Sequence, residues 1–136
     1  MQAVLDTTVA SILFNGGVLE AFYLEQGRRF ELVISFQTAE EMFFGAYKNS
    51  WGEHRLTELQ DHLLRYPVVP GTWELARQCA RVRAEAERLG RRLEPDDAWI
   101  VATAVYLGLP LITDDNDQVI PGLTGYRYIS RHGVSP

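Results

Sequence analysis

Four acidic residues draw attention because each is expected where a strand ends or a helix begins. They are Asp6, Glu41, Asp97 and Asp115. Clustered carboxylates repel one another and resist ionisation in a dry site unless a divalent cation neutralises them. Oxygen ligands without a thiolate or histidine cluster favour Mg²⁺ or Mn²⁺ over zinc. Because His54, His62 and His132 are expected elsewhere, on the surface or on helix faces, the four acids form a candidate Mg²⁺ or Mn²⁺ site.

The elements that would position these acids alternate in type along the chain. β-Branched and apolar runs predict strands over 3–5, 31–36, 109–113 and 126–129. Helices are predicted over 17–26, 38–48, 53–65, 72–89 and 96–107. The fourth of these is amphipathic, with Cys79 and Leu89 on its apolar face, and the last is nearly all apolar and therefore buried. Cys79 is thus assigned to the core and not to a reactive site.

Alternating strands and helices predict an α/β fold, a three-layer α/β/α sandwich around a mainly parallel sheet. In such a sheet the strand ends and the starts of the following helices share one edge, where ligands bind. Asp6 and Asp115 directly follow strands. Glu41 and Asp97 are expected in the first turns of helices. The four acids should therefore meet at this edge.

Each acid also has a purely structural explanation. Asp6 suits the cap of a helix that starts near residue 8. Thr38 and Glu41 have the spacing of a capping box. Asp97 follows a proline closely, as expected for an acid at a helix start, and Asp115 lies in a polar stretch that suits a turn. These explanations stay open for each acid alone, whereas the convergence of all four favours a site.

Composition and charge limit the classes of protein. A chain of 136 residues with 46% apolar residues is expected to form one domain over 1–136. The net charge of −5 argues against a simple nucleic-acid binder, although bound cations would offset it. Basic residues group at 28–29 and 77–92, either on a solvated helix face or for RNA contact. With one cysteine, no visible secretory signal and no run of about 20 apolar residues, we expect a soluble cytoplasmic protein without a membrane partner.

Four segments resemble the motifs of PIN domains, and in particular of VapC-type toxins from bacterial toxin–antitoxin pairs. They read LDTT at 5–8, AEEMFFGA at 39–46, DAWIVATA at 97–104 and LITDD at 111–115. The resemblance runs from residue 3 to about 123 and includes the ending IPGL at 120–123. It implies the PIN-like fold and an endoribonuclease that uses Mg²⁺ or Mn²⁺ to hydrolyse RNA phosphodiester bonds.

The resemblance also implies roles for individual residues. Asp6, Asp97 and Asp115 would ligate the cation, and Glu41 would ligate it or orient the attacking water; Glu41 is preferred to Glu40 because the family places its Glu four residues before a Gly. Two hydroxyl residues, Thr8 and Thr113, match positions near the cation and in the last motif.

The last motif departs from the family pattern. An Asp-Phe pair is usual there, and this chain has Gln118 and Val119. Asp117 is a candidate to replace the missing acid as a metal ligand. The departure leaves open whether one or two cations bind.

The partners implied by the resemblance are RNA, a cognate antitoxin that blocks the acidic pocket, and a second copy of the chain in a homodimer. Four aromatic residues near the pocket helix would belong either to the core, as is favoured for Phe43, or to an interface. They are Phe43, Phe44, Tyr47 and Trp51.

Three other protein classes compete with this interpretation. A haloacid dehalogenase-type phosphatase needs a second Asp two residues after the first, where this chain has Thr8. A receiver-type signalling domain needs adjacent acids after the first strand and a lysine after the last, but the only lysine is Lys48. A degenerate PIN domain that binds RNA or protein without turnover stays open, because the last motif is altered.

Overall fold

The computed structural model describes all residues 1–136, which form six strands and six α-helices. In order they are β1 (Gln2–Leu5), α1 (Thr7–Asn15), α2 (Glu20–Gly27), β2 (Glu31–Ser35), α3 (Phe36–Lys48), α4 (Glu53–Leu63), β3 (Val68–Val69), α5 (Trp73–Arg88), α6 (Pro95–Leu107), β4 (Leu111–Ile112), the short 3-10 helix η1 (Asn116–Gln118), β5 (Tyr128–Ser130) and β6 (Gly133–Val134).

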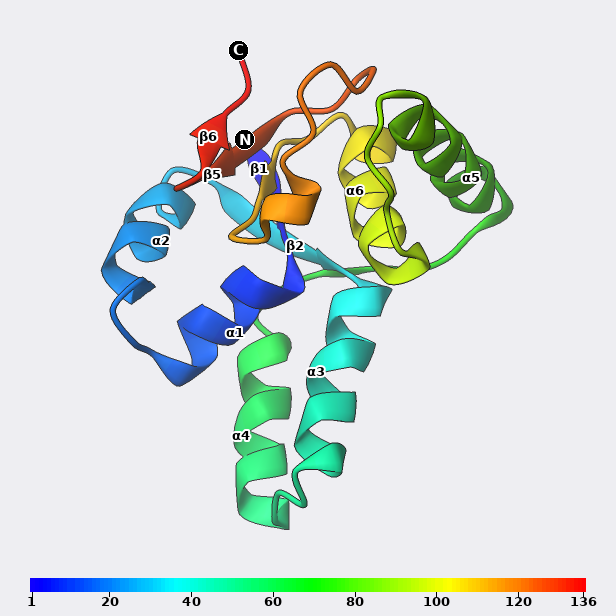
Figure 1. Ribbon diagram of the computed structural model, residues 1–136. Helices are drawn as coiled ribbons and strands as arrows, with labels where there is room; N and C mark the ends of the chain where they lie inside the picture. Colours follow the sequence, from blue (N-terminus) through cyan, green and yellow to red (C-terminus); the bar gives the residue numbers. More distant parts are fainter.

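The strands form one sheet in the order β3-β2-β1-β4-β5-β6. The first five run parallel, and only β6 pairs antiparallel with β5. The central strand β1 is buried on both sides: Val4 faces the core under α5 and α6, whereas Ala3 and Leu5 face the core under α1 to α4. Helices therefore cover both faces of the sheet (Figure 1), and the predicted three-layer α/β/α fold is confirmed.

The predicted elements are found with small shifts in their ends. Helix α1 was not among the predicted elements and was foreseen only as the helix that Asp6 would cap. Two short strands, β3 and β6, were also not predicted, because a run of two residues carries little pattern. Pro67 and Pro70 flank β3 and lack the N–H that a longer strand would donate. The strand predicted over 109–113 is shorter, with only Leu111 and Ile112 paired in β4.

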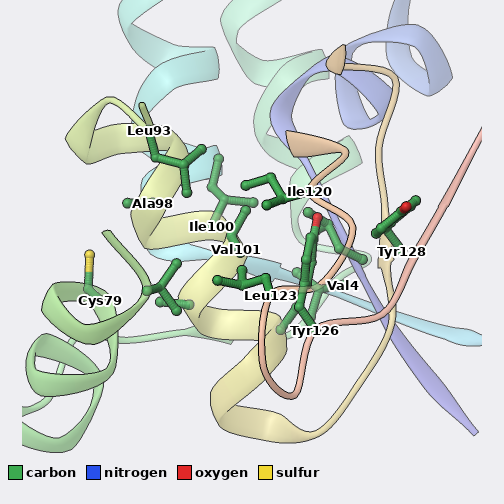
Figure 2. Packing of buried hydrophobic residues seen from close by; sticks show 14 of the residues in the cluster. Val4, Cys79, Leu93, Ala98, Ile100, Val101, Ile120, Leu123, Tyr126 and Tyr128 are labelled. Carbon is green, nitrogen blue, oxygen red and sulfur yellow. The ribbon is translucent and has the colours of Figure 1, made fainter. Parts of the chain in front are cut away.

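Helices α5 and α6 pack against each other on one face of the sheet. Cys79 lies on the buried face of α5, as predicted, within the core that Figure 2 shows. The prediction for Leu89 was wrong: it caps the end of α5 and is 44% exposed, because the helix ends one residue before it. Helix α6 is buried along most of its length and ends at Gly108, whose φ of 67° lies in the left-handed region.

Helices α3 and α4 form a hairpin that extends away from the sheet (Figure 1). None of the helices is by itself long and apolar enough to span a bilayer. Only α1 and α2 together reach that length and composition, and they are bent by 114° relative to each other.

The packing of α5 on α6 predicts the cost of a core cavity. Leu75 is completely buried in α5, so Leu75→Ala is expected to lower the free energy of unfolding by about 2–5 kcal/mol in urea titrations. The control Leu64→Ala makes the same change at a residue that is 72% exposed and should alter it by no more than about 0.5 kcal/mol. Equal effects of the two changes would contradict the assignment of the core.

Candidate active site

All four predicted acids line one pocket at the edge of the sheet where the parallel strands end. The pocket has a volume of about 360 Å³, and its lining consists of Asp6, Thr7, Thr8, Ser11, Ile12, Glu41, Asp97, Ile100, Asp115 and Gln118. No histidine and no arginine lines it. The structure thus brings together acids that are up to 109 positions apart in the sequence, since Asp6 and Asp115 both belong to this lining.

Asp6 lies at the floor of the pocket and is only 1% exposed. Its Oδ1 accepts a hydrogen bond of 2.7 Å from the backbone N–H of Val9, and its Oδ2 accepts one from the hydroxyl of Thr113. Burial raises the pKa of Asp6 to about 7, although these hydrogen bonds act in the opposite direction. Asp6 is therefore the cap of α1 and a pocket carboxylate at once, so the two explanations do not compete.

Asp97 and Asp115 face each other across the mouth of the pocket. Asp97 lies in the first turn of α6, as predicted, and oxygen atoms of Asp97, Asp115 and Asp117 lie within 4.8 Å of one another. Asp115 also caps η1 by accepting a hydrogen bond of 2.9 Å from the N–H of Asp117. Burial, followed by the negative charge of Asp115 and then of its other acidic neighbours, raises the pKa of Asp97 to about 7.

Glu41 occupies a different place in its helix from the one predicted. Ser35 caps α3, so Thr38 lies inside the helix and the alternative explanation of Glu41 as part of a capping box with Thr38 does not hold. Helix α3 begins at Phe36, which puts Glu41 in the second turn and not the first. Its carboxylate instead accepts a hydrogen bond of 3.1 Å from the hydroxyl of Thr7, at the start of α1. Burial raises the pKa of Glu41. Without the capping box, the purely structural explanation of Glu41 no longer applies.

The oxygen donors of this pocket fit a hard divalent cation. Carboxylates from the end of β1, from α3, from α6 and from the loop after β4 converge without any sulfur or imidazole ligand. Burial and then mutual repulsion raise the pKa of Asp97, and a positive ion relieves this repulsion. Mg²⁺ and Mn²⁺ prefer such oxygen ligands.

Comparison with known proteins agrees with this arrangement. The family model described as the PIN domain matches residues 3–120. The chain belongs to the PIN-domain family. A relative from Shigella flexneri, the tRNA(fMet)-specific endonuclease VapC, is 28% identical over 121 residues, which cover 87% of this chain and 89% of the relative. Ribonuclease VapC5 from Mycobacterium tuberculosis is 40% identical over 50 residues, or 37% of each chain.

Solved structures with this PIN fold include complexes of toxins with antitoxins. A toxin–antitoxin complex from Klebsiella pneumoniae has a chain with a TM-score of 0.72 and 25% identity, covering 92% of this chain and 95% of that one. VapBC2 from Rickettsia felis, bound to a DNA fragment from the promoter, has a TM-score of 0.80 at 18% identity, covering 96% and 98%. The latter likeness supports the fold alone.

Hydroxyl and amide groups complete the pocket of this PIN domain. Thr8 is an exposed part of the lining, and the hydroxyl that bonds to an acid belongs to its neighbour Thr7. Thr113 is fully buried, where it donates to Asp6 and accepts a hydrogen bond of 3.0 Å from the N–H of Asp115. Thr7 was not predicted, although its position next to Asp6 in the first turn of a helix is a usable signal.

Gln118 replaces an acid of the usual family motif and reaches the centre of the pocket. Its amide lies 3.2 Å from a carboxylate oxygen of Asp97 and 2.8 Å from the hydroxyl oxygen of Thr113. Asp117, the predicted substitute, is exposed and does not line the pocket, although it lies within reach of Asp97 and Asp115. The altered motif therefore places an uncharged group where the family pattern leads one to expect a charged one.

The raised pKa of Asp97 predicts an unusual pH dependence of stability in the metal-free protein. Between its ordinary pKa and about 7, the folded protein holds a proton on Asp97 that the unfolded chain releases, so stability is lost as the pH rises through this window. In EDTA, the free energy of unfolding should fall from pH 5 to pH 8, and Asp97→Asn should make this fall smaller.

Urea unfolding at the two pH values measures this difference. Asp61→Asn is the matched control, because Asp61 is exposed on α4 away from the pocket. The same fall in wild type and Asp97→Asn would show that Asp97 does not carry the effect.

Proposed function

We propose that this PIN domain is a ribonuclease that hydrolyses RNA phosphodiester bonds with Mg²⁺ or Mn²⁺. The observation that carries the proposal is the convergence of Asp6, Glu41, Asp97 and Asp115 in one pocket of oxygen donors. The names of the relatives, an endonuclease acting on tRNA(fMet) and a ribonuclease, agree with RNA as the substrate.

Three carboxylates are assigned to the cation. Asp6, Asp97 and Asp115 would hold Mg²⁺ or Mn²⁺, with Asp6 oriented by Thr113 and Val9. When bound, the cation supplies charge neutralisation at the phosphate and lowers the pKa of a water molecule. The pocket can then accept a polyanion in spite of the net charge of −5, because that value counts the carboxylates without their cations.

Glu41 is assigned to the attacking water. Its carboxylate is half-buried at the rim of the pocket, and Thr7 donates to one of its oxygens. This hydrogen bond fixes the carboxylate, which leaves the remaining lone pairs to accept a hydrogen bond from a water molecule beside the phosphate. Glu41 orients this water and can accept its proton.

The cellular role that fits these observations is that of a VapC-type toxin in the cytoplasm, controlled by an antitoxin. The solved structures with this fold include several toxin–antitoxin complexes. An antitoxin arginine would satisfy the same carboxylates as the cation and so compete with it. The antitoxin, the RNA and a second copy of the chain are the partners that we propose.

The proposed reaction is tested with purified protein and RNA. Cleavage is expected with Mg²⁺ or Mn²⁺ and should stop in EDTA. Asp97→Asn should reduce cleavage to background because it removes the negative charge that attracts the cation, and Glu41→Gln should also lose activity because it keeps the hydrogen bond from Thr7 but not the charge. Gel assays of cleavage and thermal melting measure activity and folding separately.

Asp61→Asn, on the surface of α4, is the control for a lost carboxylate. Wild-type cleavage by a folded Asp97→Asn variant would refute the proposal. The altered last motif favours one competing function, a degenerate PIN domain that binds without turnover. Absence of Mg²⁺ and Mn²⁺ binding at millimolar concentration in calorimetry would support that competitor.

The proposed homodimer is assigned to the exposed aromatic face of α3. Phe43 and Trp51 pack partly buried against the core, whereas Phe44 and Tyr47 are 60% and 68% exposed on the helical hairpin. Large exposed aromatic side chains are typical of protein interfaces, and a two-fold contact between copies places the same residues on both sides.

This assignment predicts that Tyr47→Asp turns a dimer into a monomer. Size-exclusion chromatography with light scattering measures the mass, and Val134→Asp, at an exposed apolar residue on β6, is the control. A monomeric wild type, or a Tyr47→Asp variant that stays dimeric, would refute the assignment.

A further inference from the structure

We propose that Gln118 is a further ligand of the cation, with its side-chain oxygen placed beside the carboxylate of Asp97. This inference rests on the cation site of the proposed function. It gives the uncharged residue of the altered motif a direct part in metal binding, which we assign to Gln118 in preference to Asp117.

The position of Gln118 is fixed by its backbone. It is the last residue of η1, and its N–H donates a hydrogen bond of 2.9 Å to the carbonyl of Asp115. Its carbonyl accepts one of 2.6 Å from the hydroxyl of Tyr126, which is itself buried. The whole residue is 1% exposed, yet its side chain forms part of the pocket lining. The terminal amide is therefore held in the pocket and keeps one main freedom, a half-turn that exchanges its oxygen and nitrogen.

The hydroxyl of Thr113 decides which of these two orientations the loaded site can have. This hydroxyl has one proton but lies within hydrogen-bond distance of two oxygens, Oδ2 of Asp6 and Oε1 of Gln118. With a cation bound, Asp6 is an ionised carboxylate. It then accepts the hydrogen bond from the hydroxyl of Thr113, since it is the nearer and the charged acceptor. The hydroxyl oxygen already accepts the N–H of Asp115 and has one lone pair left.

The remaining lone pair of the Thr113 hydroxyl favours an N–H of Gln118 as its neighbour. An amide oxygen turned toward it would face another oxygen at 2.8 Å without a proton between them. The half-turn of the amide removes this conflict, because Nε2 then donates to Thr113. The oxygen and nitrogen of a side-chain amide have nearly the same shape, so the half-turn needs no other movement.

The half-turn also brings two oxygens together at the cation. Oε1 then lies where Nε2 was, 3.2 Å from Oδ1 of Asp97. Two oxygens in this position repel each other unless a cation binds both. Neighbouring ligands of octahedral Mg²⁺, at about 2.0–2.1 Å from the ion, lie about 3 Å apart, close to the observed separation.

An amide ligand suits this particular pocket. Four carboxylates already line it, and a fifth would add to their repulsion. The amide oxygen of Gln118 supplies a hard donor without further charge, as Asn and Gln carbonyls do in other oxygen-ligated sites. Asp117 is the competing candidate, because its oxygen lies within 4.8 Å of Asp97 and Asp115 although it is exposed outside the pocket lining.

Calorimetric titration of the full chain with Mn²⁺ tests the assignment. Gln118→Met keeps the length of the side chain but removes both polar atoms, and it should weaken Mn²⁺ binding by about 10-fold or more. Asp117→Leu removes both carboxylate oxygens of the competing candidate and should weaken binding less than Gln118→Met. Gln60→Met makes the same change on the exposed face of α4 and should bind as wild type does. Thermal melting confirms that each variant is folded.

A crystal structure of the wild type with Mn²⁺ provides the second measurement and does not depend on a variant that folds. The side-chain oxygen of Gln118 is expected within bonding distance of the ion, and its nitrogen against Thr113. An ion bound at Asp97 with the amide of Gln118 out of its coordination sphere would overturn the proposal. Wild-type affinity in folded Gln118→Met, or a greater loss in Asp117→Leu, would also overturn it.

These outcomes separate the inference from the proposed function. If wild type binds Mn²⁺ and cleaves RNA while Gln118→Met binds the ion equally well, only the role of Gln118 is refuted. If wild type binds no Mn²⁺, the proposed function fails, and this inference fails with it.

Discussion

The carboxylate of Asp6 lies at the end of the central strand, almost out of contact with water, and its two oxygens tie three parts of the chain together. One accepts from the first turn of α1, and the other accepts from Thr113 just after β4. A buried carboxylate is costly unless such hydrogen bonds satisfy it. Both hydrogen bonds form only if the start of α1 and the loop after β4 are correctly placed relative to Asp6. The pairing of Leu5 with Ile112 in the sheet holds β1 and β4 in this relative position. The same contacts that stabilise the fold thus set the floor of the pocket.

The other acids are arranged around this floor at a cost to stability. Burial and neighbouring negative charge raise the pKa of Asp97 to about 7, and burial raises the pKa of Glu41 as well. A protein selected for stability alone would gain by replacing some of these acids, whereas a cation converts their repulsion into affinity. These costs are consistent with the cation site proposed for this member of the PIN-domain family.

The sequence was sufficient for the layers of the fold, because those follow from apolar periodicity and from the alternation of strands and helices. It also located all four acids of the pocket, since strand ends and helix starts share an edge of a parallel sheet. It was insufficient for the ends of the elements. Glu41 was expected in the first turn of a helix that starts at residue 38, but Ser35 caps α3 and the helix starts two residues earlier than predicted. A shift of this size changes which side chains share a turn. Thr7 was not predicted for a different reason: its contact with Glu41 joins two helices that are far apart in the sequence.

Two adjacent acids in the loop after β4 show why sequence position alone does not identify a site residue. Asp115 faces the pocket, whereas the carboxylate of Asp114 accepts hydrogen bonds from the hydroxyl of Tyr23 and from the guanidinium of Arg131. Burial acts to raise the pKa of Asp114, but these partners outweigh it and hold the pKa below its ordinary value. Arg131 belongs to the turn between β5 and β6, beyond the residues that match the family model. This C-terminal turn thus pairs one acid with an arginine and anchors the loop, whereas the other acid faces the pocket.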